Sequence, residues 1–130
     1  MKGMKFYSSL MALTLGAAVS TGAAAEDVIK IGELNSYKAQ PAFLGPYKNG
    51  MELAIEQINE SGGLNGKKVE LVIKDDNATT GDAVRVAEEL VSRDQVDVLT
   101  GTFLSHIGLA VTDFAKQKKT FFLAAEPLTD

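Results

Sequence analysis

Apolar residues along the chain gather in runs that follow two different periodicities. Four short runs rich in Val, Ile, Leu and Phe predict strands at residues 28–34, 69–73, 96–100 and 120–124. The longer stretches between them repeat apolar residues three and four positions apart, which predicts three amphipathic helices. The expected order is therefore strand and helix in strict alternation.

The first helical stretch has clear start and stop signals. Pro46 suits a first helical turn because its φ is already fixed and it has no N–H to satisfy. Gly62 and Gly63 supply the left-handed conformation that ends many helices. We therefore predict a loop at 35–45 and a helix that begins at Pro46. The apolar face of this helix consists of Met51, Ala54, Ile55 and Ile58.

The second and third helical stretches carry end signals of their own. Thr79, Thr80 and Asp82 are candidate N-caps for the second helix. Lysines at positions 116, 118 and 119 suit the negative C-terminal end of the third helix. The predicted inner faces are Ala83, Val86, Ala87, Leu90 and Val91 in the second helix, and Ile107, Ala110, Val111, Phe114 and Ala115 in the third.

Regular alternation of strands and helices predicts parallel strand pairing with right-handed crossovers. The expected fold class is α/β: an open, doubly wound parallel sheet with helices on both faces. Ligands of such sheets bind beyond the carboxyl ends of the strands, where the strand order reverses. If the order is second-first-third-fourth, the reversal lies between the first and third strands. The segments 35–45, 101–106 and 125–130 then surround the expected site.

The first 25 residues have the pattern of a secretory signal peptide. Lys2 and Lys5 precede an uncharged, mostly apolar run at 6–19, and three alanines at 23–25 provide the small residues that signal peptidase requires. We predict cleavage before Glu26 rather than an uncleaved anchor, which leaves an extracytoplasmic domain at 26–130. Because the fourth predicted strand lies so near the end of the sequence, we also expect a fragment of a longer protein.

Composition and motifs exclude several classes of function. The chain has no cysteine, so it has no disulfide, thiolate zinc site or cysteine nucleophile. A net charge of −4 without a basic stripe argues against a nucleic-acid partner. No glycine-rich phosphate motif follows the first strand. Ser105 and His106 are adjacent, so they cannot converge as a catalytic pair, and the single histidine has no second ligand at metal spacing. We expect no catalytic residue, metal or cofactor.

A candidate recognition surface remains beside the predicted strand reversal. Ser105 lies where the third strand turns into the third helix, and helix N–H groups with a hydroxyl suit a carboxylate; a plain N-cap is the alternative. Glu126, after the fourth strand, is placed either to receive a ligand's ammonium or amide N–H or to lie in solvent. The first loop and its end contribute residues that either wall a ligand or cover the core edge: Tyr37, Phe43, Leu44 and Tyr47.

Five segments of the sequence carry a family resemblance: IKIGEL, NGMELAIEQINESGGLNGKKVEL, KDDNATTGDAVRVAEELV, VDVLTGTFLS and AAEPLTD. Over residues 29–130 the chain resembles the branched-chain amino acid-binding family of ABC-importer substrate-binding proteins. This resemblance implies the N-terminal lobe of a two-lobe periplasmic-binding-protein type I fold. The second lobe, and the second half of the ligand site, would then lie past Asp130.

The resemblance also implies how a ligand is held. The ligand's carboxylate is expected at the start of the third helix, and further contacts are expected from the segment after the fourth strand and from a wall in the first loop. Glu126 stands where a small hydroxyl residue is common, and Leu44 stands where an aromatic ring is frequent. These departures widen the expected ligands to amides, urea derivatives and aromatic acids. The site residues implied in this way are Leu44, Ser105, His106, Ala124, Ala125 and Glu126.

The function expected from the residues and the resemblance is a non-enzymatic, extracytoplasmic receptor of an ABC importer. It would bind a small solute between two lobes and deliver it to permease subunits, which would be its only contact with the membrane. Two alternatives stay open. One is a ligand-sensing receptor domain of the same fold. The other is a secreted α/β enzyme whose catalytic residues lie beyond Asp130.

Overall fold

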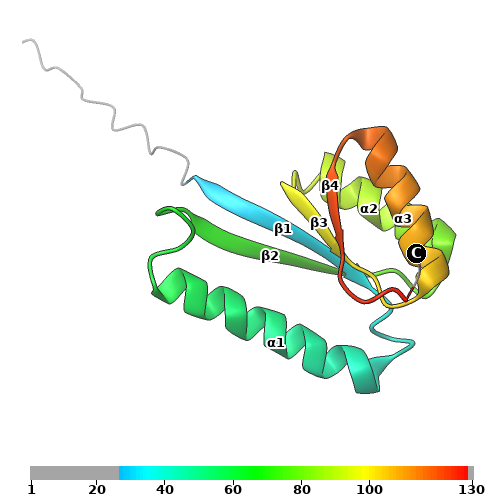
Figure 1. The fold of residues 1–130 in the computed structure, drawn as a ribbon, viewed down its shortest axis with the longest axis horizontal. Coiled ribbons are helices and arrows are strands. Elements are labelled where there is room, and N and C mark those ends of the chain that lie inside the picture. The colour runs from blue at the N-terminus through cyan, green and yellow to red at the C-terminus, as the bar shows by residue number, and fades with distance from the viewer. Residues whose placement is uncertain (1–26, 129–130) are drawn as a thin grey trace, which may run out of the picture.

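The computed structural model of the chain describes residues 27–128, so the predicted leader lies outside the described residues. Strands and helices alternate as the sequence predicts (Figure 1). Strand boundaries differ from the predicted ones by at most two residues. The elements are β1 (Val28–Asn35), α1 (Pro41–Glu60), β2 (Lys68–Asp75), α2 (Thr80–Ser92), β3 (Val98–Gly101), α3 (Ser105–Lys118) and β4 (Phe121–Ala124).

The four strands form one parallel sheet in the order β2-β1-β3-β4, which confirms the predicted fold class and strand order. Figure 1 shows α1 on one side of the sheet and α2 with α3 on the other. Because side chains alternate along a strand, Leu34 and Leu99 face α2 and α3, whereas Glu33 faces the side of α1. Glu33 is in register with Thr100 of β3, and Thr100 with Leu123 of β4.

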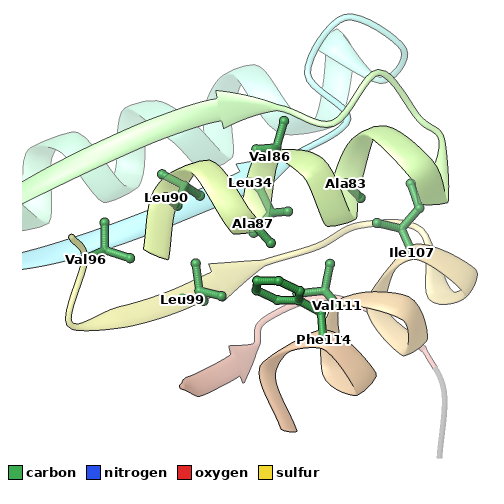
Figure 2. Close-up of a cluster of buried hydrophobic side chains, with 10 residues drawn as sticks. All are labelled: Leu34, Ala83, Val86, Ala87, Leu90, Val96, Leu99, Ile107, Val111 and Phe114. Carbon is green, nitrogen blue, oxygen red and sulfur yellow. The ribbon is translucent and has the colours of Figure 1, made fainter. Parts of the chain in front are cut away.

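The main hydrophobic core lies between the sheet and the pair α2 and α3 (Figure 2). The inner faces predicted for the second and third helices supply most of it. Thr79 caps α2 as predicted, because its hydroxyl accepts a hydrogen bond from the Asp82 N–H at 3.2 Å. The core residues are Leu34, Ala83, Val86, Ala87, Leu90, Val96, Leu99, Ile107, Val111 and Phe114.

The predicted start of the first helix was wrong, because α1 begins at Pro41 and not at Pro46. Either proline suits a first turn, but Leu44 is fully buried, and its packing holds the earlier turn in helical form. Pro46 lies inside the helix, where it costs the one hydrogen bond that its N–H would have made to Ala42. The predicted loop at 35–45 therefore shrinks to the residues between β1 and α1.

None of the helices within residues 27–128 combines the length and the apolar character that crossing a membrane requires. The longest, α1, has polar and charged side chains along much of its length.

Candidate functional site

The carboxyl ends of β1, β3 and β4 meet at one edge of the sheet, where the sequence predicted the site. Leu34 of β1 is in register with Gly101, and Gly101 is in register with Ala124 of β4. Gly101 has φ +122°, and a Cβ there would lie 2.0 Å from the carbonyl oxygen of Leu34. Only glycine therefore allows β3 to end so close to β1. This close approach places the loop after β3 next to the end of β1.

Asn35, the last residue of β1, is fully buried and connects the converging segments. Its side-chain oxygen accepts hydrogen bonds from the N–H of Ser36 at 3.1 Å and from the N–H of Phe103 at 2.7 Å. Its side-chain nitrogen donates to Glu33 at 3.2 Å and to Glu126 at 3.3 Å. The amide thus joins β1 to the loop before α3 and to the segment after β4.

Glu33 places a carboxyl group with no exposed surface near the end of β1, an inner strand of the sheet. The Tyr37 hydroxyl donates to its Oε2 atom at 2.6 Å, and Asn35 donates to its Oε1 atom. Burial raises the pKa of Glu33 from 4.5 to about 7, and the charges of Glu126 and Asp76 add to the rise, although the two hydrogen bonds oppose it. Near neutral pH the protonated and ionised forms of this carboxyl group are therefore both populated.

Two tyrosines surround the same carboxyl group. Burial, together with the Glu33 carboxylate, raises the pKa of Tyr37 well above its ordinary value. Burial and then the charges of Glu33 and Glu126 raise the pKa of Tyr47, on α1, to about 12. Both tyrosines are half-buried and stay protonated at neutral pH, so each offers a hydroxyl that can donate. We call Glu33, Asn35, Tyr37, Tyr47 and Glu126 the polar cluster.

The start of α3 leaves backbone N–H groups free beside this cluster. Ser105 is the first helical residue, and the N-cap position is Leu104, which makes no side-chain cap. The N-cap alternative for Ser105 was therefore wrong. The Leu104 carbonyl accepts hydrogen bonds from the N–H groups of Ile107 and Gly108 at 3.0 and 2.9 Å. The N–H groups of Ser105 and His106 come before these and belong to the first turn, which has no partner within the helix. An anion is the natural partner of such a turn.

His106 follows Ser105 on the exposed side of the turn. Burial raises the pKa of Asp76, and the hydrogen bonds from Ser36 and Ala78 and the nearby His106 only partly oppose this rise. Asp76 itself accepts a hydrogen bond from the Ser36 hydroxyl at 2.7 Å. His106 is thus near the strand ends, but on the flank that faces the end of β2.

The residue at the predicted apolar wall, Leu44, is not at the surface of this edge. It lies in the first turn of α1 with no exposed surface, whereas the sequence had placed it in a loop. Its neighbour Phe43 is 65% exposed and stacks on Phe103 of the loop before α3, with ring centroids 5.9 Å apart and planes 18° apart. The exposed aromatic surface beside the strand ends comes from this pair.

The segment after β4 is held against β3 by its backbone. Ala124 is in register with Gly101, and the N–H of Ala125 donates to the Gly101 carbonyl at 2.7 Å. Glu126 then turns toward Asn35. Of the predicted site residues, the structure brings Tyr37 and Glu126 together in the polar cluster, places Ser105 and His106 at the start of α3, and leaves Leu44 in the interior.

Sequence reasoning missed Glu33, Asn35 and Phe103. A signal for Glu33 existed, because Glu33 shares one strand face with Ile29 and Ile31, and that face was expected to be apolar and covered. A carboxylate on such a face needs partners, which marks it as a candidate functional residue. The partners themselves come from distant parts of the chain and are not visible in a local pattern.

Within residues 27–128, no three His, Asp or Glu side chains gather closely enough to hold a metal ion. An open concavity is found at the opposite, amino-terminal edge of the sheet, away from the polar cluster. It is lined by Asp27, Asn59, Gly62, Gly63, Gly66 and Lys68.

Comparison with known proteins identifies the family. The family model described as periplasmic binding protein matches residues 28–130, so the chain belongs to the periplasmic binding protein family. A Leu/Ile/Val-binding protein homolog 7 of Brucella suis is 33% identical over 108 residues, which are 82% of this chain and 27% of that protein. The leucine-, isoleucine-, valine-, threonine- and alanine-binding protein of Pseudomonas aeruginosa is 35% identical over 113 residues, which are 86% of this chain and 30% of that protein.

Solved structures of transporter substrate-binding proteins also match this chain. The branched-chain amino acid transporter substrate-binding protein of Streptococcus pneumoniae, in complex with isoleucine, superposes with a TM-score of 0.73 at 28% identity, over 79% of this chain and 30% of that one. A solute-binding protein of an ABC transporter from Rhodopseudomonas palustris, in complex with 3,4-dihydroxybenzoic acid, superposes with a TM-score of 0.70 at 28% identity. The match covers 78% of this chain and 28% of that one. These findings confirm the family resemblance and the type I fold. This chain spans less than a third of the length of these relatives.

Proposed function

We propose that this chain forms the N-terminal lobe of an extracytoplasmic receptor of an ABC importer, which binds a small solute between two lobes. The observation that carries the proposal is the meeting of three strand ends around Asn35, beside the free first turn of α3. Such an edge is where open α/β sheets bind ligands. The family and the binding proteins among the relatives support the same function.

The ligand class that fits this edge is a small carboxylated or amide solute. Isoleucine and 3,4-dihydroxybenzoic acid, found with two structural relatives, share a carboxylate, and the start of α3 with Ser105 offers N–H and hydroxyl donors for one. Glu126 offers an acceptor for an ammonium or amide N–H. The Phe43 and Phe103 pair offers an apolar surface. We therefore propose branched-chain or related amino acids, amides, urea derivatives and aromatic acids as ligands.

The proposed location and partners follow from the family of the chain and from its predicted signal peptide. The N-terminal residues have the pattern of an export signal, which agrees with a periplasmic or other extracytoplasmic location. The receptor would have two partners, the small molecule and the permease subunits that accept the solute. Closure of the two lobes would let the permease distinguish a loaded receptor from an empty one.

Calorimetric titration of the full-length protein tests this function. We expect binding of isoleucine, 3,4-dihydroxybenzoic acid or acetamide, and we expect Ser105→Ala to weaken a carboxylated ligand about tenfold or more, as the loss of a hydrogen bond to a charged group predicts. Thr112→Ala is the matched control, because it removes a hydroxyl from the middle of the same helix, where it donates to the Gly108 carbonyl. Equal affinities for Ser105→Ala and wild type would remove Ser105 from the site. Failure of every probe to bind would contradict the proposed ligand class.

A further inference from the structure

The side chain of Asn35 uses its full hydrogen-bonding capacity. A carboxamide can accept two hydrogen bonds and donate two. Asn35 accepts from the N–H groups of Ser36 and Phe103, and it donates to the carboxylates of Glu33 and Glu126. The residue is completely buried, so losing one of these partners leaves a polar atom without solvent to replace it.

Two of the four bonds connect Asn35 to segments that are far from it in the sequence. Phe103 is 68 residues from Asn35 and lies two positions before Ser105, whereas Glu126 is 91 residues away and follows β4. Among the bonds described for residues 27–128, Asn35 is the one side chain that reaches both segments. Beyond the backbone pairing of the strands, one amide side chain therefore ties both the loop that leads into α3 and the segment after β4 to β1.

We propose that Asn35 is a positioning residue of the ligand site, one that fixes Ser105 and Glu126 relative to each other by holding both of their segments against β1. This inference rests on the proposed function, because it assumes that these two segments face the ligand. A site whose groups are already in place loses less entropy when the ligand binds. Asn35 itself is buried beneath the contacting groups and does not touch the ligand.

The chemistry of the cluster requires an amide at this position. An aspartate has nearly the same shape and still accepts from Phe103, but in its ionised form it cannot donate to Glu33 or Glu126 and instead repels both. When it is protonated it regains one donor. A variant with aspartate here should therefore recover as the pH falls. Glu33 and Glu126 are the titratable groups that bond to Asn35, and Tyr37, Tyr47 and Asp76 act on the Glu33 carboxyl group. His106 lies farther out, beside Asp76.

Hydrogen exchange of the full-length protein, read peptide by peptide and corrected for intrinsic rates, tests the proposal without any ligand. At pH 8 we expect Asn35→Asp to speed exchange about tenfold or more in both 101–106 and 123–128, as a loss of about 1.4 kcal/mol would. The difference in exchange rate between Asn35→Asp and wild type should shrink at pH 5. The control Asn59→Asp breaks a comparable amide bridge, which joins α1 to Val69 through two bonds of 2.8 Å. It should speed exchange only near 59 and 69.

Binding provides the second measurement. The affinity for isoleucine or 3,4-dihydroxybenzoic acid, whichever binds the wild type, should fall about tenfold or more in Asn35→Asp at pH 8 and recover partly at pH 5. The inference would be overturned if Asn35→Asp exchanged as slowly as wild type in both 101–106 and 123–128. It would also be overturned if Asn35→Asp and Asn59→Asp sped exchange in the same segments. If no probe binds the wild type, the proposed function fails while the exchange data still decide whether Asn35 ties the segments.

A milder pair of variants covers the case in which Asn35→Asp does not fold. Glu126→Ala removes one arm of the connection from a half-buried residue near the end of the described chain, and Glu126→Gln keeps an oxygen that can accept from Asn35. We expect faster exchange at 123–128 in Glu126→Ala and not in Glu126→Gln. Equal exchange in the two variants would contradict the role assigned to the Asn35 bond.

Discussion

Replacing Glu33 with glutamine should remove a pH-dependent weakness from the fold. Glu33 has no exposed surface, and its ionised form must exist beside Glu126 and Asp76. Glutamine keeps an oxygen that can accept from Asn35, and its nitrogen can donate to the oxygen of the Tyr37 hydroxyl. Glu33→Gln therefore preserves the shape and most of the bonding of the site while removing the charge.

The size and sign of the effect follow from the raised pKa. An acid whose pKa is higher in the folded state than in the unfolded one binds more protons when folded, so stability falls as pH rises between the two values. For Glu33 these are 4.5 and about 7. Such a rise corresponds to a loss of about 3 kcal/mol, most of it between pH 5 and pH 8.5. The stabilising contribution is complete below pH 4.5 and gone above about pH 8.

Urea unfolding of the full-length wild type and Glu33→Gln across this pH range measures the difference. Glu33→Gln should unfold at nearly the same urea concentration as wild type at pH 5 and at a clearly higher one at pH 8.5. Glu70→Gln is the matched control, because it removes a carboxylate from an exposed position of β2. A constant gap between Glu33→Gln and wild type at every pH would show that the Glu33 carboxyl does not titrate in this range.

Two further pairs of substitutions test the packing around the site. Leu44→Ala should lower the free energy of unfolding by about 2–4 kcal/mol, because Leu44 is fully buried. Phe43→Ala should lower the free energy of unfolding by at most about 1 kcal/mol, but it should weaken the binding of 3,4-dihydroxybenzoic acid. If Phe43→Ala were the less stable of the two variants in urea unfolding, the burial of Leu44 would be refuted. Gly101→Ala should lose about 3 kcal/mol or more, since its Cβ would meet the Leu34 carbonyl, whereas Gly66→Ala, also at positive φ but in open space, should lose only about 1 kcal/mol by the same measurement.

The order of elements and the strand order were predictable because they depend on local signals. Periodicity distinguishes helices from strands, and Gly62 with Gly63 marks the end of α1 without any knowledge of tertiary contacts. Parallel pairing and the crossover rule then leave few arrangements of four strands. The strand reversal, and with it the edge where Ser105 and Glu126 lie, follows from that order.

The start of α1 and the polar cluster were not predictable in this way. Pro41 and Pro46 give the same local signal, and only the burial of Leu44 distinguishes them. Glu33 carries a signal of its own, but its connection to Glu126 runs through Asn35 across the sheet. Contacts of that kind exist only after the strands have paired, so no spacing in the sequence encodes them.

The location of a bound ligand tests the proposed receptor function most directly. A crystal structure of the full-length protein with isoleucine or 3,4-dihydroxybenzoic acid should show the carboxylate against the first turn of α3, next to Ser105, with the rest of the molecule between the polar cluster and a second lobe. A ligand in the concavity near Asn59, at the amino-terminal edge of the sheet, would contradict the proposed site.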